Sequence, residues 1–372
     1  MLQSIAVYGG VMLFMFIFAM IASAKDQSSR VKRDRPTPFF TWDVIVILLA
    51  FALIFGIRYD VGTDHLNYLY AYRHISPERY EPIFKWITDT LRFSDIHFSI
   101  YFGLLAFLQL CFVLYSVKNE KYIYPFLILT LFMGQFFWHW MNGIRQDIAG
   151  CIYVLAVTFI VERKPLKFLL FTIIAIGFHY SSILLLPTYF ILYKGKDLTP
   201  NKFIQLALLI IVGYLAITKF DVLAAIYPLI SSAIDLLDYS QYDLDALERY
   251  GSITRQGMSL YTFIVLDALV ILYSNKMKEY FTGKRFIIYY NLYYWGMLAQ
   301  LFLVNNMVLA RPVRFFRCFK LLMIAFFLYY LYRNSNSKIN VIVFIFALML
   351  LAILFAATIV NEPYKFYWDY LW

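Results

Sequence analysis

Residues 126–161 read FLILTLFMGQFFWHWMNGIRQDIAGCIYVLAVTFIV. Two long apolar runs flank the polar stretch MNGIRQDIAG, which occupies residues 141–150. A helix needs about 20 apolar residues to cross roughly 30 Å of hydrocarbon. The stretch therefore predicts two membrane helices, and it places Arg145 and Asp147 at the start of the second one.

The rest of the chain has the same character. Of its 372 residues, 62% are hydrophobic and only 15% are charged, and the mean hydropathy is +0.67. This composition is typical of an all-α polytopic membrane protein. Because apolar runs recur along the whole length, residues 1–372 are interpreted as a single integral membrane domain. The first run, residues 2–24, lacks a basic leader and is expected to be a retained span.

The three cysteines, Cys111, Cys151 and Cys318, all lie inside apolar segments. They are expected to be small buried hydrophobic side chains and not a disulfide framework. The net charge of +10 is interpreted as a topology signal, so no nucleic-acid partner is expected.

Hydropathy and length predict ten spans and one longer run with a break. That run, residues 165–193, carries GFHYSS at its centre, and we expect two half-length helices that turn at residues 179–182. Counting both halves gives about twelve membrane segments, with a broken or re-entrant pair near His179. The ten spans are placed at residues 3–24, 42–58, 98–117, 122–140, 143–161, 203–218, 259–275, 286–304, 313–332 and 339–360.

Charge predicts the orientation of these spans. The loops on one side of the predicted bundle carry 19 of the 33 Lys and Arg residues and six acids. Basic loops remain in the cytoplasm, so both termini and the two longest loops, 59–97 and 219–257, are predicted to lie outside. We expect two helices in the first loop, the second starting at Glu81 with Pro82 at its first position, and an interfacial helix in the second loop.

Two side chains are predicted to lie unusually deep. Arg145 is 16 residues, or about 24 Å, above the inner end of its span, and His179 is about 20 Å above the inner boundary. An unpaired charge at such a depth costs a few kcal/mol, so Arg145 needs a partner or a wet cavity. Two simpler interpretations remain open: Arg145 extends to the headgroups, and His179 is a buried histidine bonded to a neighbour.

A third basic element is ARPVRFFRCFK, in which Arg311, Arg314 and Arg317 recur every three residues and Lys320 continues the row. These residues lie at the predicted outer end of a span, where the positive-inside rule disfavours them. They suit a clamp for a phosphate or diphosphate, which arginine binds in bidentate fashion. Contact with anionic lipid headgroups is the alternative.

Carboxylates add candidates for proton transfer. Asp64 and Glu81 lie in the first outer loop, and either one could act as a base or simply cap a helix. Asp60 and Asp64 lack the spacing of a metal site, so no metal and no cofactor are expected. Asp267 lies in the middle of a span and must have a partner, which the sequence does not identify.

Arg145, His179 and the arginine row are all predicted at one depth of one leaflet, beside an aromatic outer loop. This arrangement favours a site for an anionic, lipid-linked substrate. Aromatic rings can stack on the apolar faces of sugars. The rings considered for glycan binding are Tyr68, Tyr72, Trp138 and Trp140.

Four stretches in this order, GTDHLNYLYAY, NGIRQDIA, GFHYSSILLLP and ARPVRFF, resemble the pattern of the EpsG family over about residues 30–330. Members of that family are similar to Wzy-type polymerases of exopolysaccharide, capsule and O-antigen. His65, where an aromatic residue is expected, and Phe315 and Phe316, near an expected tyrosine, depart from the pattern.

The resemblance implies a GT-C-like glycosyltransferase in the bacterial cytoplasmic membrane, with its site facing the periplasm or exterior. It would join undecaprenyl-pyrophosphate-linked repeat units, alongside a flippase and a chain-length regulator. In the implied roles Arg145, Arg311, Arg314 and Arg317 bind the diphosphate. His179, Asp64 and Glu81 are the candidate catalytic groups, and their order is left open.

Three other functions are weighed against a polymerase. A flippase for lipid-linked oligosaccharide predicts charges at the bilayer centre and an internal repeat, and the sequence has no evident repeat. A membrane acyltransferase should place basic residues at the inner side, where its donor arrives. A scaffold or chain-length regulator has no need of a buried arginine.

Overall fold

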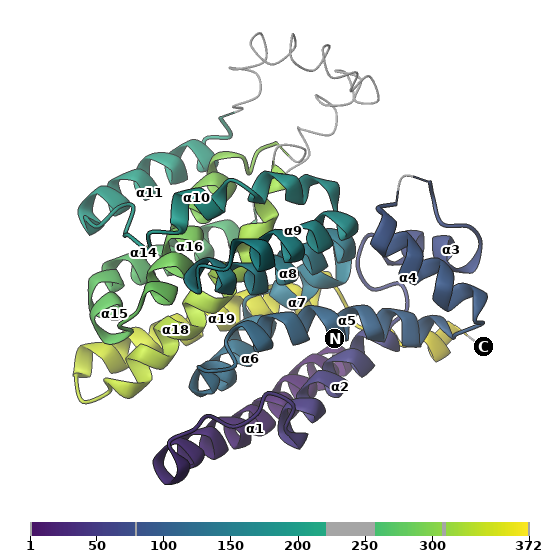
Figure 1. Ribbon diagram of the computed structural model, residues 1–372, viewed down its shortest axis with the longest axis horizontal. Helices are drawn as coiled ribbons and strands as arrows, with labels where there is room; N and C mark the ends of the chain where they lie inside the picture. Colours follow the sequence, from purple (N-terminus) through teal and green to yellow (C-terminus); the bar gives the residue numbers. More distant parts are fainter. Residues whose placement is uncertain (1, 79, 221–256, 307–309, 371–372) are drawn as a thin grey trace.

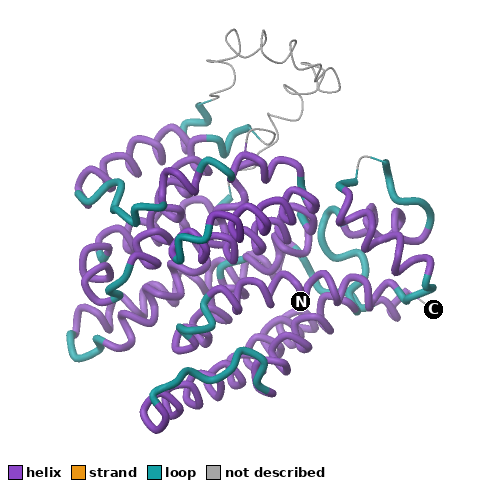
Figure 2. The backbone as a smooth tube through the Cα atoms, viewed as in Figure 1, coloured by secondary structure: helices purple, strands orange, loops and turns teal. Residues whose placement is uncertain are grey.

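The computed structural model describes residues 2–78, 80–220, 257–306 and 310–370. Regular structure in this part of the chain is helical, apart from one isolated antiparallel bridge between Arg58 and Phe366 (Figures 1 and 2). The α-helices of the first half are α1 (Leu2–Arg33), α2 (Trp42–Gly56), α3 (His65–Arg73), α4 (Pro82–Phe93), α5 (Phe98–Ser116), α6 (Tyr124–Met133), α7 (Phe136–Asn142), α8 (Ile144–Val161) and α9 (Pro165–Phe178). Those of the second half are α10 (Thr188–Leu192), α11 (Lys202–Ile217), α14 (Met258–Leu272), α15 (Ser274–Tyr280), α16 (Lys284–Phe302), α18 (Arg317–Arg333) and α19 (Lys338–Asn361). The 3₁₀ helices are η1 (Lys121–Ile123), η2 (Tyr180–Leu185), η3 (Pro312–Phe316) and η4 (Tyr367–Tyr370).

The chain is an all-α, multi-pass membrane protein by the hydropathy of its helices. Within the described residues, five helices are long and apolar enough to cross a membrane: α1, α5, α8, η3 with α18, and α19. A sixth span is possible in α14 and α15, which together are apolar enough but are bent by 54°. The other apolar helices, among them α2, α9 and α11, are shorter than a full crossing, so the predicted count of twelve is not reproduced by full-length helices.

The predicted span at 122–140 is one case in which the structure differs. It is divided into α6 and α7 at Gly134 and Gln135, and Gln135 has a left-handed backbone with φ 64°. The side-chain amide of Gln135 donates to the Leu354 carbonyl of α19 at 2.9 Å. A helix can break inside a bundle when neighbouring groups satisfy its polar atoms, and this amide supplies one such bond.

Helix α8 lies in the middle of the bundle and is buried along most of its length, packed between α5 and α9. Close backbone contact holds the neighbouring pair α2 and α5 together. A Cβ atom on Gly56 would lie 2.3 Å from the Ser99 carbonyl oxygen, a separation that real atoms do not adopt. Small residues at such crossings allow membrane helices to approach closely.

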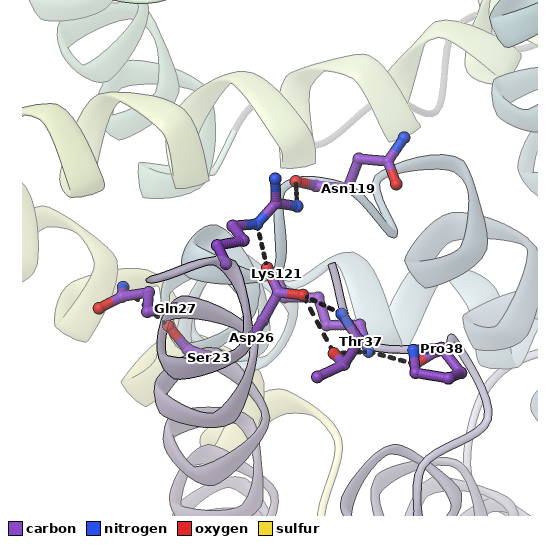
Figure 3. A network of polar contacts seen from close by, with 8 residues as sticks. Ser23, Asp26, Gln27, Thr37, Pro38, Asn119 and Lys121 are labelled. Atoms are coloured by element: carbon purple, nitrogen blue, oxygen red, sulfur yellow. Dashed lines mark hydrogen bonds and ion pairs between the residues drawn. The ribbon is translucent and has the colours of Figure 1, made fainter. Parts of the chain in front are cut away.

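The two ends of the bundle are named here by the residues that they hold. One end, here called the basic end, holds the network in Figure 3. There the buried Asp26 of α1 accepts hydrogen bonds from the backbone and hydroxyl of Thr37, and Lys121 donates to Thr37 and to the Pro38 carbonyl. These bonds fix the α1–α2 connection against the start of η1. The opposite end, here called the site end, is where α8 begins and α9 stops.

The helices predicted for the loop 59–97 are confirmed as α3 and α4, which lie to one side of the main bundle in Figure 1. Helix α4 begins at Pro82, directly after Glu81, as expected. The predicted interfacial helix in the loop 219–257 falls outside the described residues.

Candidate functional site

Glu81 lies at the centre of the site, with a carboxylate that bridges two basic side chains. Its Oε2 is 2.6 Å from Arg145 Nη1, and its Oε1 is 2.8 Å from His179 Nδ1. The side chain of Glu81 is only 3% exposed, whereas those of Arg145 and His179 are 22% and 23% exposed. Three segments far apart in the sequence therefore meet at one buried carboxylate, and the two basic side chains are more exposed than the carboxylate.

The local sequence explains why Glu81 is free to do this. It precedes the proline that opens α4 and has an extended backbone, with φ −64° and ψ 150°. This is the N-cap position, yet the side chain makes no capping hydrogen bond. The capping interpretation of Glu81 is therefore wrong, because the carboxylate points to Arg145 and His179.

His179 is presented by the break in the predicted run 165–193. Helix α9 ends at Phe178, His179 is extended with φ −159° and ψ 115°, and η2 follows. The backbone N–H of Tyr180 donates to Glu81 Oε1 at 3.4 Å. The expected break at His179 is thus confirmed, and the carboxylate satisfies one of the amides that the break leaves free.

Arg145 lies in the first turn of α8. Its guanidinium carbon lies 4.7 Å from the centroid of the Tyr80 ring, and the group also interacts with the Tyr68 side chain. The ion pair with Glu81 holds the arginine within the protein. Arg145 is therefore paired inside the protein and does not simply extend to the lipid headgroups.

The charge on Glu81 follows from these partners. Burial raises the pKa of its carboxyl, but the hydrogen bond from His179 and the charge of Arg145 together outweigh burial, and the pKa lies below the ordinary value. The group is therefore a carboxylate at neutral pH. Because a carboxylate only accepts hydrogen bonds, His179 Nδ1 carries the proton of this contact, and Nε2 of a neutral ring keeps its lone pair.

The arginine row lies close to the same end of α8. Residues Pro312–Phe316 form a 3₁₀ helix, in which positions three apart eclipse one another. This turn brings Arg311, Arg314 and Arg317 to one side. Element η3 packs against α8, and Gln146 donates a hydrogen bond to the Arg311 carbonyl.

Two carboxylates act on the row electrostatically. Asp147 influences both Arg314 and Arg317, and Asp64 also influences Arg314. Arg314 Nε is enclosed and has no hydrogen-bond partner among the described residues. Arg311 is the exposed member of the row, and Arg314 and Arg317 are half-buried. The sequence pattern alone indicated no role for Asp147 in the site, although this residue lies only two positions from Arg145.

The fourth basic residue of the row has a different environment. Lys320 Nζ is 2.6 Å from Asp267 Oδ2, and Tyr293 donates to the other oxygen of Asp267 at 3.0 Å. Asp267 thereby has the partner that its depth requires. The pair connects α14 with α18.

The rings considered for glycan binding are mostly part of the packing. Trp140 is buried against Phe51, and Tyr72 is stacked on Tyr101 with its hydroxyl bonded to the Ile96 carbonyl. Tyr68 is buried beside Arg145, and Trp138 is half-buried. Because the faces of Tyr72 and Trp140 are covered, neither is available to a sugar in this arrangement. The ring that contacts Arg145 is that of Tyr80, which was not identified from the sequence. Its position directly before Glu81 was the one feature of the sequence that could have pointed to it.

Other site features agree with the sequence only in part. Asp64 is the N-cap of α3 by position, but its side chain makes no capping bond. His65 packs as an aromatic residue, with its ring 4.7 Å from that of Phe102. Cys151 and Cys318 are buried free thiols, as predicted, and Cys111 is partly buried. Within the described residues no group of three potential metal ligands occurs.

These features define the class of the protein: it is a multi-pass helical membrane protein with a cluster of carboxylate, histidine and arginine side chains at one end of its bundle. Residues 41–372 match the model of the EpsG family, and the chain belongs to that family, which is linked to exopolysaccharide synthesis. No curated protein and no solved structure matches the chain.

Proposed function

We propose that this protein is a membrane glycosyltransferase of the Wzy-like polymerase type. It joins oligosaccharide repeat units carried on undecaprenyl pyrophosphate, in the bacterial cytoplasmic membrane, with the site end facing the periplasm or exterior. The observation that carries the proposal is the Glu81 bridge between Arg145 and His179, beside an arginine row at the start of α8.

The proposed reaction needs a base for the acceptor hydroxyl. His179 suits this role because Glu81 holds Nδ1 and fixes the tautomer, which leaves the Nε2 lone pair for a proton. Glu81 is a weaker candidate, since its ion pair with Arg145 lowers its basicity. Asp64 is the alternative base, because its coulombic effect on Arg314 indicates that it lies near the arginine row.

The leaving group needs stabilised charge. The acceptor oxygen forms a bond to the anomeric carbon, the bond from that carbon to the diphosphate oxygen breaks, and its electron pair leaves with the diphosphate. Arg311, Arg314 and Arg317 can hold this anion, since fixed cations act strongly in a water-poor site. In this proposal Arg145 serves mainly to orient Glu81, with one face toward the diphosphate.

The proposal is tested in a deletion strain that carries plasmid-borne variants. Loss of a polymerase leaves single repeat units displayed on lipid or at the surface, whereas loss of a flippase leaves none displayed. Wild-type protein should restore polymer, and His179→Ala should leave single units at normal protein levels. Absence of displayed units in the deletion strain would contradict the polymerase and favour the transporter.

A further inference from the structure

Arg58 is a buried cation that contacts the chain just before α8. It follows α2, is 1% exposed, and its Nη2 donates to the Met141 carbonyl at 2.8 Å. Its guanidinium carbon lies 5.5 Å from the Phe55 ring centroid and 5.8 Å from that of Phe102. Arg58 forms no ion pair with a carboxylate in the described part of the chain.

The carbonyl that Arg58 holds lies at a structural junction. Met141 is near the end of α7, and α8 begins after Gly143 with Arg145 in its first turn. The preceding carbonyl, that of Trp140, accepts a hydrogen bond from the buried Gln109 of α5 at 3.1 Å. Two consecutive carbonyls, four and five residues before Arg145, are therefore held by side chains from other segments of the chain.

The backbone around Arg58 is fixed as well. Tyr59 N–H donates to the Lys365 carbonyl, and Tyr367 N–H donates to the Ile57 carbonyl, each at 3.0 Å. The Tyr364 hydroxyl donates to the Ile54 carbonyl at 2.6 Å. The segment 362–367 thus lies across the site end of α2 and prevents Arg58 from shifting.

Burying this charge is costly, which argues that the residue does more than fill space. An arginine guanidinium does not lose its proton in a protein, so the Arg58 side chain is charged at neutral pH. Its Nε and Nη1 have no hydrogen-bond partner within the described residues. A buried group that is only partly satisfied destabilises the fold.

We propose that Arg58 is a positioning residue: by holding the Met141 carbonyl it sets the α7–α8 junction and so places the Arg145 guanidinium on Glu81. The contact is geometric and independent of which reaction the site performs. Only its effect on polymer formation rests on the proposed function.

A double-mutant cycle on purified, detergent-solubilised full-length protein tests this. Glu81→Gln should lower the thermal midpoint of the wild type, and most of that loss should disappear in an Arg58→Met background, because Arg145 is then no longer held on Glu81. Distant residues that are not coupled give additive effects. Additive shifts in midpoint would overturn the proposal.

The matched control is Lys121, a buried cation at the basic end that also donates to a backbone carbonyl. Lys121→Met should lower the midpoint, yet the Glu81→Gln loss should remain complete in that background. Arg58→Lys should restore most of the coupling; if Arg58→Met does not fold, Arg58→Lys and Arg58→Gln are compared in its place, and equal coupling in the two would overturn the proposal.

Polymer formation gives the second measurement. At a temperature well below both midpoints, Arg58→Met should reduce the rate per folded molecule and Lys121→Met should not. If the wild type makes no polymer, the proposed function fails while the thermal cycle still decides the role of Arg58. If polymer forms but the cycle is additive, only the role of Arg58 fails.

Discussion

At the scale of single residues, the site depends on one carboxylate with two different partners. Both carboxylate oxygens of Glu81 have a partner, since Oε2 contacts Arg145 and Oε1 contacts His179. An ion pair of this kind makes the glutamate a poor base and a good orienting group. The histidine, which is more exposed and has a fixed tautomer, becomes the group that can meet a substrate.

We therefore expect His179→Ala to reduce polymer formation by about 10²–10⁴-fold, the range typical of general acid–base catalysis. The rate per folded molecule, measured with purified protein and lipid-linked repeat units, checks this. His74→Ala is the control and should retain wild-type activity, because the exposed side chain of His74 contacts Tyr70 of its own helix. Full activity of His179→Ala would remove it as the base.

The lowered pKa of Glu81 predicts how stability depends on pH. A carboxyl whose folded pKa is depressed contributes stability that is present above its unfolded pKa and is lost as pH falls through the folded pKa. The thermal midpoints of wild type and Glu81→Gln should therefore differ at pH 7 and converge as the pH falls below about 4. A gap that persists unchanged at the lowest pH would mean that Glu81 is not ionised in the folded state.

At the scale of elements, the pair of Lys320 and Asp267 locks α14 to α18 inside the bundle. The side chain of Asp267 is fully enclosed, and that of Lys320 is 11% exposed. Removing one member of such a pair leaves an uncompensated charge, whereas replacing both by apolar groups is often neutral.

Lys320→Met should thus lower stability by about 3–5 kcal/mol, and the double change Lys320→Met with Asp267→Leu should recover most of it. Thermal unfolding in detergent measures both. Lys164→Met, in the exposed pair with Glu162, should cost only about 0–1 kcal/mol. A double variant less stable than the single one would show that the charges themselves are required.

At the scale of the whole molecule, the distribution of Lys and Arg predicts an orientation in which the basic end lies in the cytoplasm and the site end lies outside. In a cysteine-free background, Ile75→Cys lies in the exposed connection between α3 and α4, and Lys276→Cys lies in the exposed first turn of α15. A membrane-impermeant thiol reagent should label the first variant in intact cells and the second only after permeabilisation. The reverse pattern would place the site in the cytoplasm.

The sequence by itself was sufficient for the membrane class, for most helix positions and for the break at His179. These depend on local hydrophobicity, proline and glycine, which act over a few residues. It also identified Glu81, Arg145, His179 and the arginine row as candidates, because a charged or polar group near an apolar run has a free-energy cost that a partner or a function must offset. The division of residues 122–140 was not predicted, since Gln135 finds its acceptor on α19, more than 200 positions away.

The roles within the site were decided only by tertiary structure. Whether Glu81 caps α4 or binds Arg145 and His179 depends on which side chains are packed beside it, and these come from α8 and from the end of α9. The burial of Tyr72 and Trp140, the pairing of Asp267 with Lys320, and the contact of Arg58 with Met141 have the same origin. Each is a contact between segments distant in the chain, and a local pattern of residues does not specify which distant segment it will meet.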